Sequence, residues 1–112
     1  MLASLAVKVK ISMSVVSTMH DYVIQQLIEL ATKYRVQKVI LFGSRARGDH
    51  SPVSDYDFAI YEDGLSDITK ACLCGDVEDI ETLKKIDIVF VNGITPRELL
   101  KNILQEGVVI YE

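Results

Sequence analysis

Apolar and polar residues follow two different periods along the chain, and the period changes several times after residue 18. From residue 18 onwards, apolar side chains recur every three to four positions, which predicts a helix with one buried face. This stripe comprises Val23, Leu27, Leu30 and Tyr34, with Ile24, Ile28 and Ala31 beside it. Thr18 together with Asp21 is a candidate cap for the start of this helix. The apolar run at 39–42 is short and predicts a buried strand that ends at Gly43.

The next strand shows a period of two. Successive side chains of a strand point to opposite faces, so Asp55 and Asp57 are expected on one face and Tyr56, Phe58 and Ile60 on the other. A second strand pattern covers residues 85–91, where a single acid, Asp87, interrupts an apolar run.

The remaining segments are expected to be helical, apart from a short last strand. Residues 65–84 predict a helix that is broken near Gly75. Residues 96–106 predict another, because Thr95 and Glu98 have the spacing of a capping box with Pro96 at the first helical position. Gly107 ends this helix, and 108–111 would form the last strand. The resulting order predicts an α/β (α+β) fold.

Composition limits the organisation of the chain. Its 112 residues, 49% hydrophobic and 25% charged, suit one globular core. We therefore expect a single domain at 19–112, preceded by an N-terminal extension at 1–18. The apolar stretches are only strand-length, so no membrane span is expected. The net charge of −4 argues against autonomous binding of duplex nucleic acid, which requires many Lys and Arg contacts to phosphate.

The two cysteines, Cys72 and Cys74, have a spacing that suits neither a zinc site nor an easy disulfide. They are interpreted as packing residues, in agreement with a reducing cytoplasm. His20 and His50 have no cysteine partners at ligand spacing, which also argues against zinc.

The chemistry is concentrated between residues 43 and 57. Gly43 lets the backbone approach a ligand closely, and Ser44 is a candidate cap whose hydroxyl lies beside unpaired backbone N–H groups. Such a turn suits an anion, and Arg47, with Arg45 nearby, adds positive charge. The glycine spacing of a P-loop is present, but Asp49 and His50 stand where Lys and Ser or Thr belong, so that motif is excluded.

A third acid, Asp87, lies in the strand pattern at 85–91. If this strand pairs beside the one that follows Asp55, three carboxylates converge and need a cation. Magnesium fits, because it prefers carboxylate and phosphate oxygens. Each signal alone is weak, since isolated acids and Gly-Ser turns are common at solvated strand ends; the combination at this spacing favours a functional site.

Gly43 and Ser44, ten intervening residues and then Asp55-Tyr56-Asp57 resemble the minimal nucleotidyltransferases of the polymerase-beta superfamily, and Asp87 stands where that family has its third acid. The resemblance implies a mixed sheet with helices packed on one side. It implies two Mg²⁺ ions on Asp55, Asp57 and Asp87, and a nucleoside triphosphate, with ATP expected, whose distal phosphates are held by Gly43 and Ser44. Asp87 would also help to deprotonate the acceptor.

The resemblance further suggests an antitoxin that transfers AMP to a hydroxyl of a helical HEPN partner, because little of this chain lies outside the catalytic core and the acceptor would come from a second protein. Two alternatives stay open. One is transfer to a small molecule such as an aminoglycoside, with a homodimer or second subunit completing the pocket. The other is a module that neutralises a toxin by contact alone.

Overall fold

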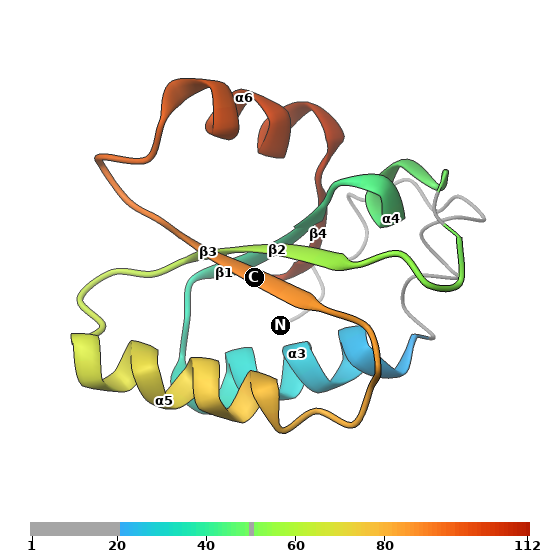
Figure 1. Ribbon diagram of the computed structural model, residues 1–112. Helices are drawn as coiled ribbons and strands as arrows, with labels where there is room; N and C mark the ends of the chain where they lie inside the picture. The colour runs from blue at the N-terminus through green and yellow to red at the C-terminus, as the bar shows by residue number, and fades with distance from the viewer. Residues whose placement is uncertain (1–20, 50) are drawn as a thin grey trace.

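The computed structural model describes residues 21–49 and 51–112, so Thr18, His20, His50 and the proposed boundary between extension and domain lie outside the described part. Its centre is a four-stranded sheet in the order β3-β2-β1-β4 (Figure 1). The strands are β1 (Lys38–Phe42), β2 (Tyr56–Tyr61), β3 (Ile86–Val91) and β4 (Val108–Tyr111). β1 runs antiparallel to both β2 and β4, whereas β2 and β3 are parallel. The mixed sheet that we expected is therefore confirmed.

Among the described residues, three longer helices cover the two faces of this sheet. α3 (Tyr22–Tyr34) and α5 (Asp67–Glu78) lie side by side on one face, and α6 (Arg97–Glu106) lies on the other (Figure 1). The expected packing on one side thus describes α3 and α5 but not α6. The short helix α4 (Ser44–Arg47) follows the end of β1 directly. Within the described residues, no helix is long and apolar enough to span a bilayer.

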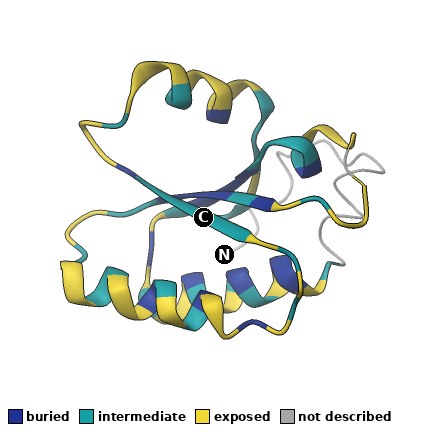
Figure 2. Ribbon diagram, in the orientation of Figure 1, coloured by how far each residue is buried: buried dark blue, intermediate teal, exposed yellow. Residues whose placement is uncertain are grey.

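The alternation within β2 separates the face of the sheet that packs into the larger core from the face that carries Asp57. Tyr56, Phe58 and Ile60 are almost completely buried in the larger core, which α3 and α5 close (Figure 2). Ala59 belongs instead to a smaller cluster under α6, together with Ile40 and Ile103. Asp57 therefore shares the α6 face, as the period of two predicted.

The capping role predicted for Asp21 is confirmed. α3 begins at Tyr22, with Asp21 as an extended N-cap whose carboxylate accepts hydrogen bonds from the backbone N–H groups of Val23 and Ile24. Other local predictions were wrong. α5 is not broken at Gly75: the helix runs from Asp67 to Glu78, and residues 79–85 form the connection to β3. Gly75 is exposed, and a helix tolerates such a glycine at a cost of roughly 1 kcal/mol when neighbouring residues pack well.

The capping box before α6 is also absent. Pro96 is the N-cap rather than the first helical residue, and the Thr95 hydroxyl accepts a hydrogen bond from the Asn92 N–H instead. Thr95 therefore stabilises the turn after β3. Both cysteines are free; Cys74 is half-buried, but Cys72 is exposed and so is not a packing residue.

Candidate active site

The register of the two parallel strands brings the predicted acids together. Asp57 of β2 lies directly opposite Asp87 of β3, and both belong to the α6 face. Asp55 immediately precedes β2 and is exposed at the edge of the same site. The strand pairing required for three acids to converge is therefore present.

The charges of these acids act on one another. Partial burial raises the pKa of Asp57, and the negative charges of Asp87 and Asp55 raise it further. Lys85 and Arg47 oppose this effect. Lys85 also forms an ion pair with Asp87, with 3.5 Å between Nζ and Oδ1. The ionised form of Asp57 is thus disfavoured unless additional positive charge is present.

Gly43 presses the turn after β1 against Asp57. Its backbone has φ +80° and ψ −160°, a combination that essentially only glycine adopts. A Cβ atom added at this position would lie 2.5 Å from Asp57 Oδ2. The glycine is therefore required for two reasons: the backbone conformation and the closeness of the turn to the acid.

Ser44 is the first residue of α4 rather than its cap, because Gly43 occupies the N-cap position. The Gly43 carbonyl accepts hydrogen bonds from the backbone N–H groups of Ala46 and Arg47, each at 3.1 Å. The first N–H groups of a helix have no partner within it, so the turn between Gly43 and Ser44 presents backbone donors beside Asp57.

Arg45 has a structural position instead of the phosphate contact that its sequence position suggested. Its side chain is buried, stacks on the Tyr56 ring at 4.0 Å and donates hydrogen bonds to the carbonyls of Ser54 and Pro52. Asp21 completes the group: it lies 3.9 Å from the guanidinium and accepts a 2.6 Å hydrogen bond from the Tyr56 hydroxyl. Burial, followed by this hydrogen bond, raises the Tyr56 pKa above its usual range.

These contacts hold the loop that leads into β2. Because Tyr56 stands between Asp55 and Asp57, fixing Tyr56 from the core side also fixes the acids on the opposite side. This role of Asp21 and Tyr56 was not predicted from the sequence. The only signal that could have suggested it is the presence of polar residues at the start of the first helix and within the motif.

Arg47, by contrast, is exposed. Its Nε donates to Asp49 Oδ2 and its Nη1 to Glu106 Oε1, each at 3.1 Å. It remains close enough to the acids to lower the pKa of Asp57.

The donor set of the acid cluster fits a hard divalent cation, since it consists of carboxylate oxygens whose repulsion a cation would relieve. Within residues 21–49 and 51–112, however, no group of three or more His, Cys, Asp or Glu side chains is close enough to enclose a metal ion. The three carboxylates are near neighbours without forming a closed cage.

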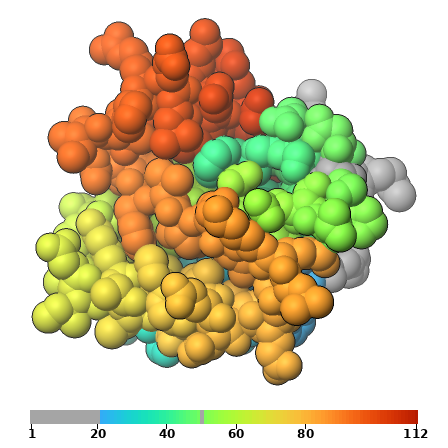
Figure 3. Space-filling view, viewed as in Figure 1, coloured from blue at the N-terminus to red at the C-terminus, as the bar shows by residue number. Residues whose placement is uncertain are grey.

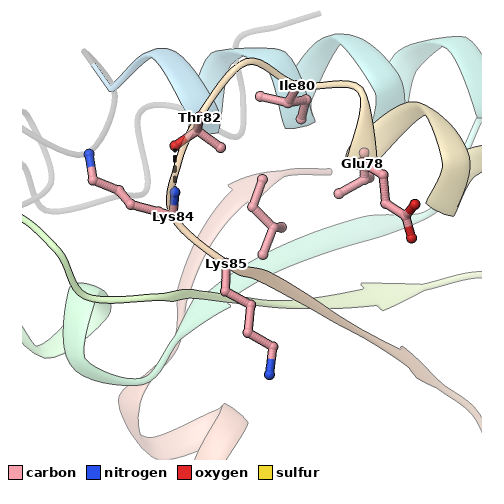
Figure 4. Close-up of a pocket in the computed structure, with 7 residues that line it drawn as sticks. Glu78, Ile80, Thr82, Lys84 and Lys85 are labelled. Atoms are coloured by element: carbon pink, nitrogen blue, oxygen red, sulfur yellow. Dashed lines mark hydrogen bonds between the residues drawn. The ribbon is translucent and has the colours of Figure 1, made fainter.

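A separate hollow of about 300 Å³ lies between the end of α5 and the start of β3 (Figure 4). Its apolar lining, Val77, Ile80 and Ile86, belongs to the core face, opposite Asp57 and Asp87. Lys85, at its rim, points away from Ile80 and Thr82. This hollow is therefore distinct from the acid site.

The fold has a counterpart among known protein families. Residues 25–112 match the family model described as polymerase beta, nucleotidyltransferase, which covers most of the chain. The chain belongs to this family and is a nucleotidyltransferase.

Individual proteins are similar to the chain in sequence or in structure. A protein of Methanocaldococcus jannaschii, named a protein adenylyltransferase, is 37% identical over 94 residues, which cover 73% of this chain and 87% of the relative. A crystal structure of a toxin-antitoxin with AMP-PNP has a TM-score of 0.63 at 22% identity and covers 78% of this chain and 71% of that one.

A second structure contains a tri-AMPylated Shewanella oneidensis HEPN toxin in complex with its MNT antitoxin. It has a TM-score of 0.58 at 20% identity, with coverage of 79% and 68%. At these identities the two structures show a shared fold.

Proposed function

We propose that this chain transfers AMP from ATP to a hydroxyl of a partner protein, and that the partner is a HEPN-type toxin. The main observation in support is that the Gly43 turn lies close to Asp57, with Asp87 directly opposite Asp57, so the turn that would bind phosphate and the paired carboxylates meet at one point. The M. jannaschii relative, named a protein adenylyltransferase, supports the reaction, and the toxin-antitoxin neighbours support the kind of partner.

Each residue of the site has a separate role, which follows from its position. The Ser44 hydroxyl and the backbone N–H groups of the Gly43 turn hold the distal phosphates, and Arg47 contributes positive charge to them. Asp87 accepts the proton of the attacking hydroxyl, and pyrophosphate leaves as the new bond forms at the α-phosphorus. Phosphoryl transfer depends mainly on positioning and electrostatic stabilisation, which rigid strands provide.

Asp55, Asp57 and Asp87 are the residues that would hold Mg²⁺. When bound, two such ions would neutralise charge on the phosphates and stabilise the attacking and leaving oxygens. The raised pKa of Asp57 supports this assignment, because its ionised form lacks sufficient compensating charge in the protein alone.

The test is the intact mass of a HEPN-type toxin after co-expression with the wild type of this chain, with Asp55→Asn/Asp57→Asn and with Asp63→Asn. Asp63 is an exposed acid in a turn outside the site and serves as the matched control. We expect a gain of one or more AMP units with the wild type and the control, and none with the double variant.

Two results would contradict the proposal. An unmodified partner in a stable wild-type complex, with full neutralisation by the double variant, would favour a module that acts by contact alone. Nucleotide transfer to an aminoglycoside in the absence of any protein partner would favour the small-molecule alternative.

A further inference from the structure

The guanidinium of Arg47 is held between two carboxylates that come from different parts of the chain. Asp49 lies two positions after Arg47, whereas Glu106 lies 59 positions after Arg47 and ends α6. In Figure 3 the green atoms of α4 lie close to the orange-red atoms of α6. The ion pair between Arg47 and Glu106 therefore joins the phosphate-binding turn to the helix on the same face.

Glu106 has an unfavourable place for an acid. The C-terminal end of a helix carries partial negative charge, which favours Lys or Arg there. The last turn of α6 contains no basic residue, yet Glu106 stands at its end. Helix stability alone does not account for this residue, whereas the ion pair with Arg47 does.

The two contacts fix the orientation of the Arg47 guanidinium and leave some of its N–H donors available. Arginine has five N–H donors in a planar fork, and Nε and Nη1 each use one toward Asp49 and Glu106. The remaining donors can meet a phosphate, and a side chain already fixed in place loses less conformational entropy on binding. Arg47 ends the short helix that begins directly after Gly43, and the turn at Gly43 touches Asp57, so this positive charge lies beside the acid site.

We propose that Glu106 is a positioning residue for the nucleotide: together with Asp49 it fixes the Arg47 guanidinium at the mouth of the acid site, where it meets the triphosphate of ATP. This inference rests on the proposed function and adds a residue that the motif does not contain. Glu106 acts through Arg47 and does not itself contact the nucleotide.

The expected effect is modest. The Arg47 side chain is 43% exposed and that of Glu106 31%, and ion pairs in such positions are screened by solvent. Loss of the pair should weaken ATP binding roughly twofold to fivefold. AMP lacks the distal phosphates, so its binding should not change.

The experiment measures dissociation constants by calorimetric titration with ATP and with AMP, each with MgCl₂, for the wild type and four variants. The four variants are Glu106→Gln, Arg47→Ala, the double variant Arg47→Ala/Glu106→Gln and Glu98→Gln. Glu98 lies on the exposed surface at the start of the same helix and controls for loss of an acidic charge from α6.

We expect Glu106→Gln to weaken ATP binding alone, to keep the wild-type melting temperature without nucleotide, and to have no effect when Arg47 is already alanine. Glu98→Gln should bind as the wild type does. Tighter ATP binding by Glu106→Gln would mean that the carboxylate competes with phosphate and would overturn the inference. So would unchanged ATP binding, an equal change for AMP, or an undiminished effect in the double variant. Failure of the wild type itself to bind ATP would instead overturn the proposed function.

Discussion

Replacing Gly43 by alanine tests how closely the turn after β1 must approach the acids. The backbone at this position, φ +80° and ψ −160°, is one that residues with a side chain avoid at a cost of about 1–3 kcal/mol. The added methyl carbon would also lie 2.5 Å from Asp57 Oδ2, a distance at which one of the two groups must move.

The two effects have different consequences. The backbone cost lowers the free energy of unfolding, and in a domain of this size each 1 kcal/mol corresponds to a change in melting temperature of about 4–8 °C. Movement of the Asp57 carboxylate acts on catalysis, where a misplacement of about 1 Å can reduce the rate roughly 100-fold. We therefore expect Gly43→Ala to fold with a lowered melting temperature and to lose nearly all transfer activity.

Gly64→Ala is the matched control. Gly64 also has a positive φ of +85°, but no heavy atom outside its own chain neighbours lies within 4 Å of the added Cβ atom. It should lower the melting temperature by a similar backbone effect and leave transfer unchanged. The assay is single-turnover AMP transfer to the partner, with melting followed by circular dichroism. Wild-type transfer by Gly43→Ala, or equal loss of transfer by both variants, would refute the reasoning.

Three other predictions concern charge and packing. Asp57→Asn should raise the melting temperature at pH 7 without nucleotide, because the pKa of Asp57 is raised in the folded protein, mainly by burial and then by Asp87 and Asp55. The folded state holds the Asp57 proton more strongly than the unfolded state, so the stability of the wild type falls as pH rises from about 3.9 through the raised pKa. The gain in melting temperature of Asp57→Asn over the wild type should therefore vanish below that pH interval. Equal gains at pH 3 and pH 7 would contradict this. Mg²⁺ with ATP should raise the wild-type melting temperature, by an amount equivalent to about 2.7 kcal/mol at a ligand concentration 100 times the dissociation constant. Scanning fluorimetry measures this shift, which should disappear when EDTA is added. No shift at saturating Mg-ATP would count against a formed site. Arg45→Lys should reduce the free energy of unfolding in urea by about 1–3 kcal/mol, because the carbonyls of Ser54 and Pro52 lose the planar fork that pairs with them; an unchanged urea midpoint would show that these contacts add no stability.

The strands and their faces could be predicted because they follow from local patterns. The apolar run before Gly43 and the alternation after Asp55 are strand signals within a few residues, and each was found where the pattern put it. The opposition of Asp57 and Asp87 needed one further condition, namely that β2 and β3 are neighbours, which the structure meets. The roles of the acids as ligands stay a prediction.

The two arginines show why the rest of the site could not be predicted from the sequence. Arg45 and Arg47 are two residues apart on one helical turn, so their side chains leave α4 in different directions and meet different surroundings. Arg45 enters the core beside Tyr56, while Arg47 stays at the surface near Glu106. The partners that distinguish them come from distant parts of the chain, and no local pattern identifies such partners.

The same dependence on distant partners explains how the fold fixes the acids. Among the described residues, Asp55 and Asp57 form no side-chain hydrogen bond or ion pair that would hold their geometry, whereas Tyr56 between them is held by Asp21 and Arg45. Since neighbouring residues of a strand share one backbone, restraint applied to Tyr56 on the core face limits the movement of both acids on the other. The site can therefore keep mutually repelling carboxylates close together, because the energy that opposes their separation comes from burial and hydrogen bonding beneath the sheet.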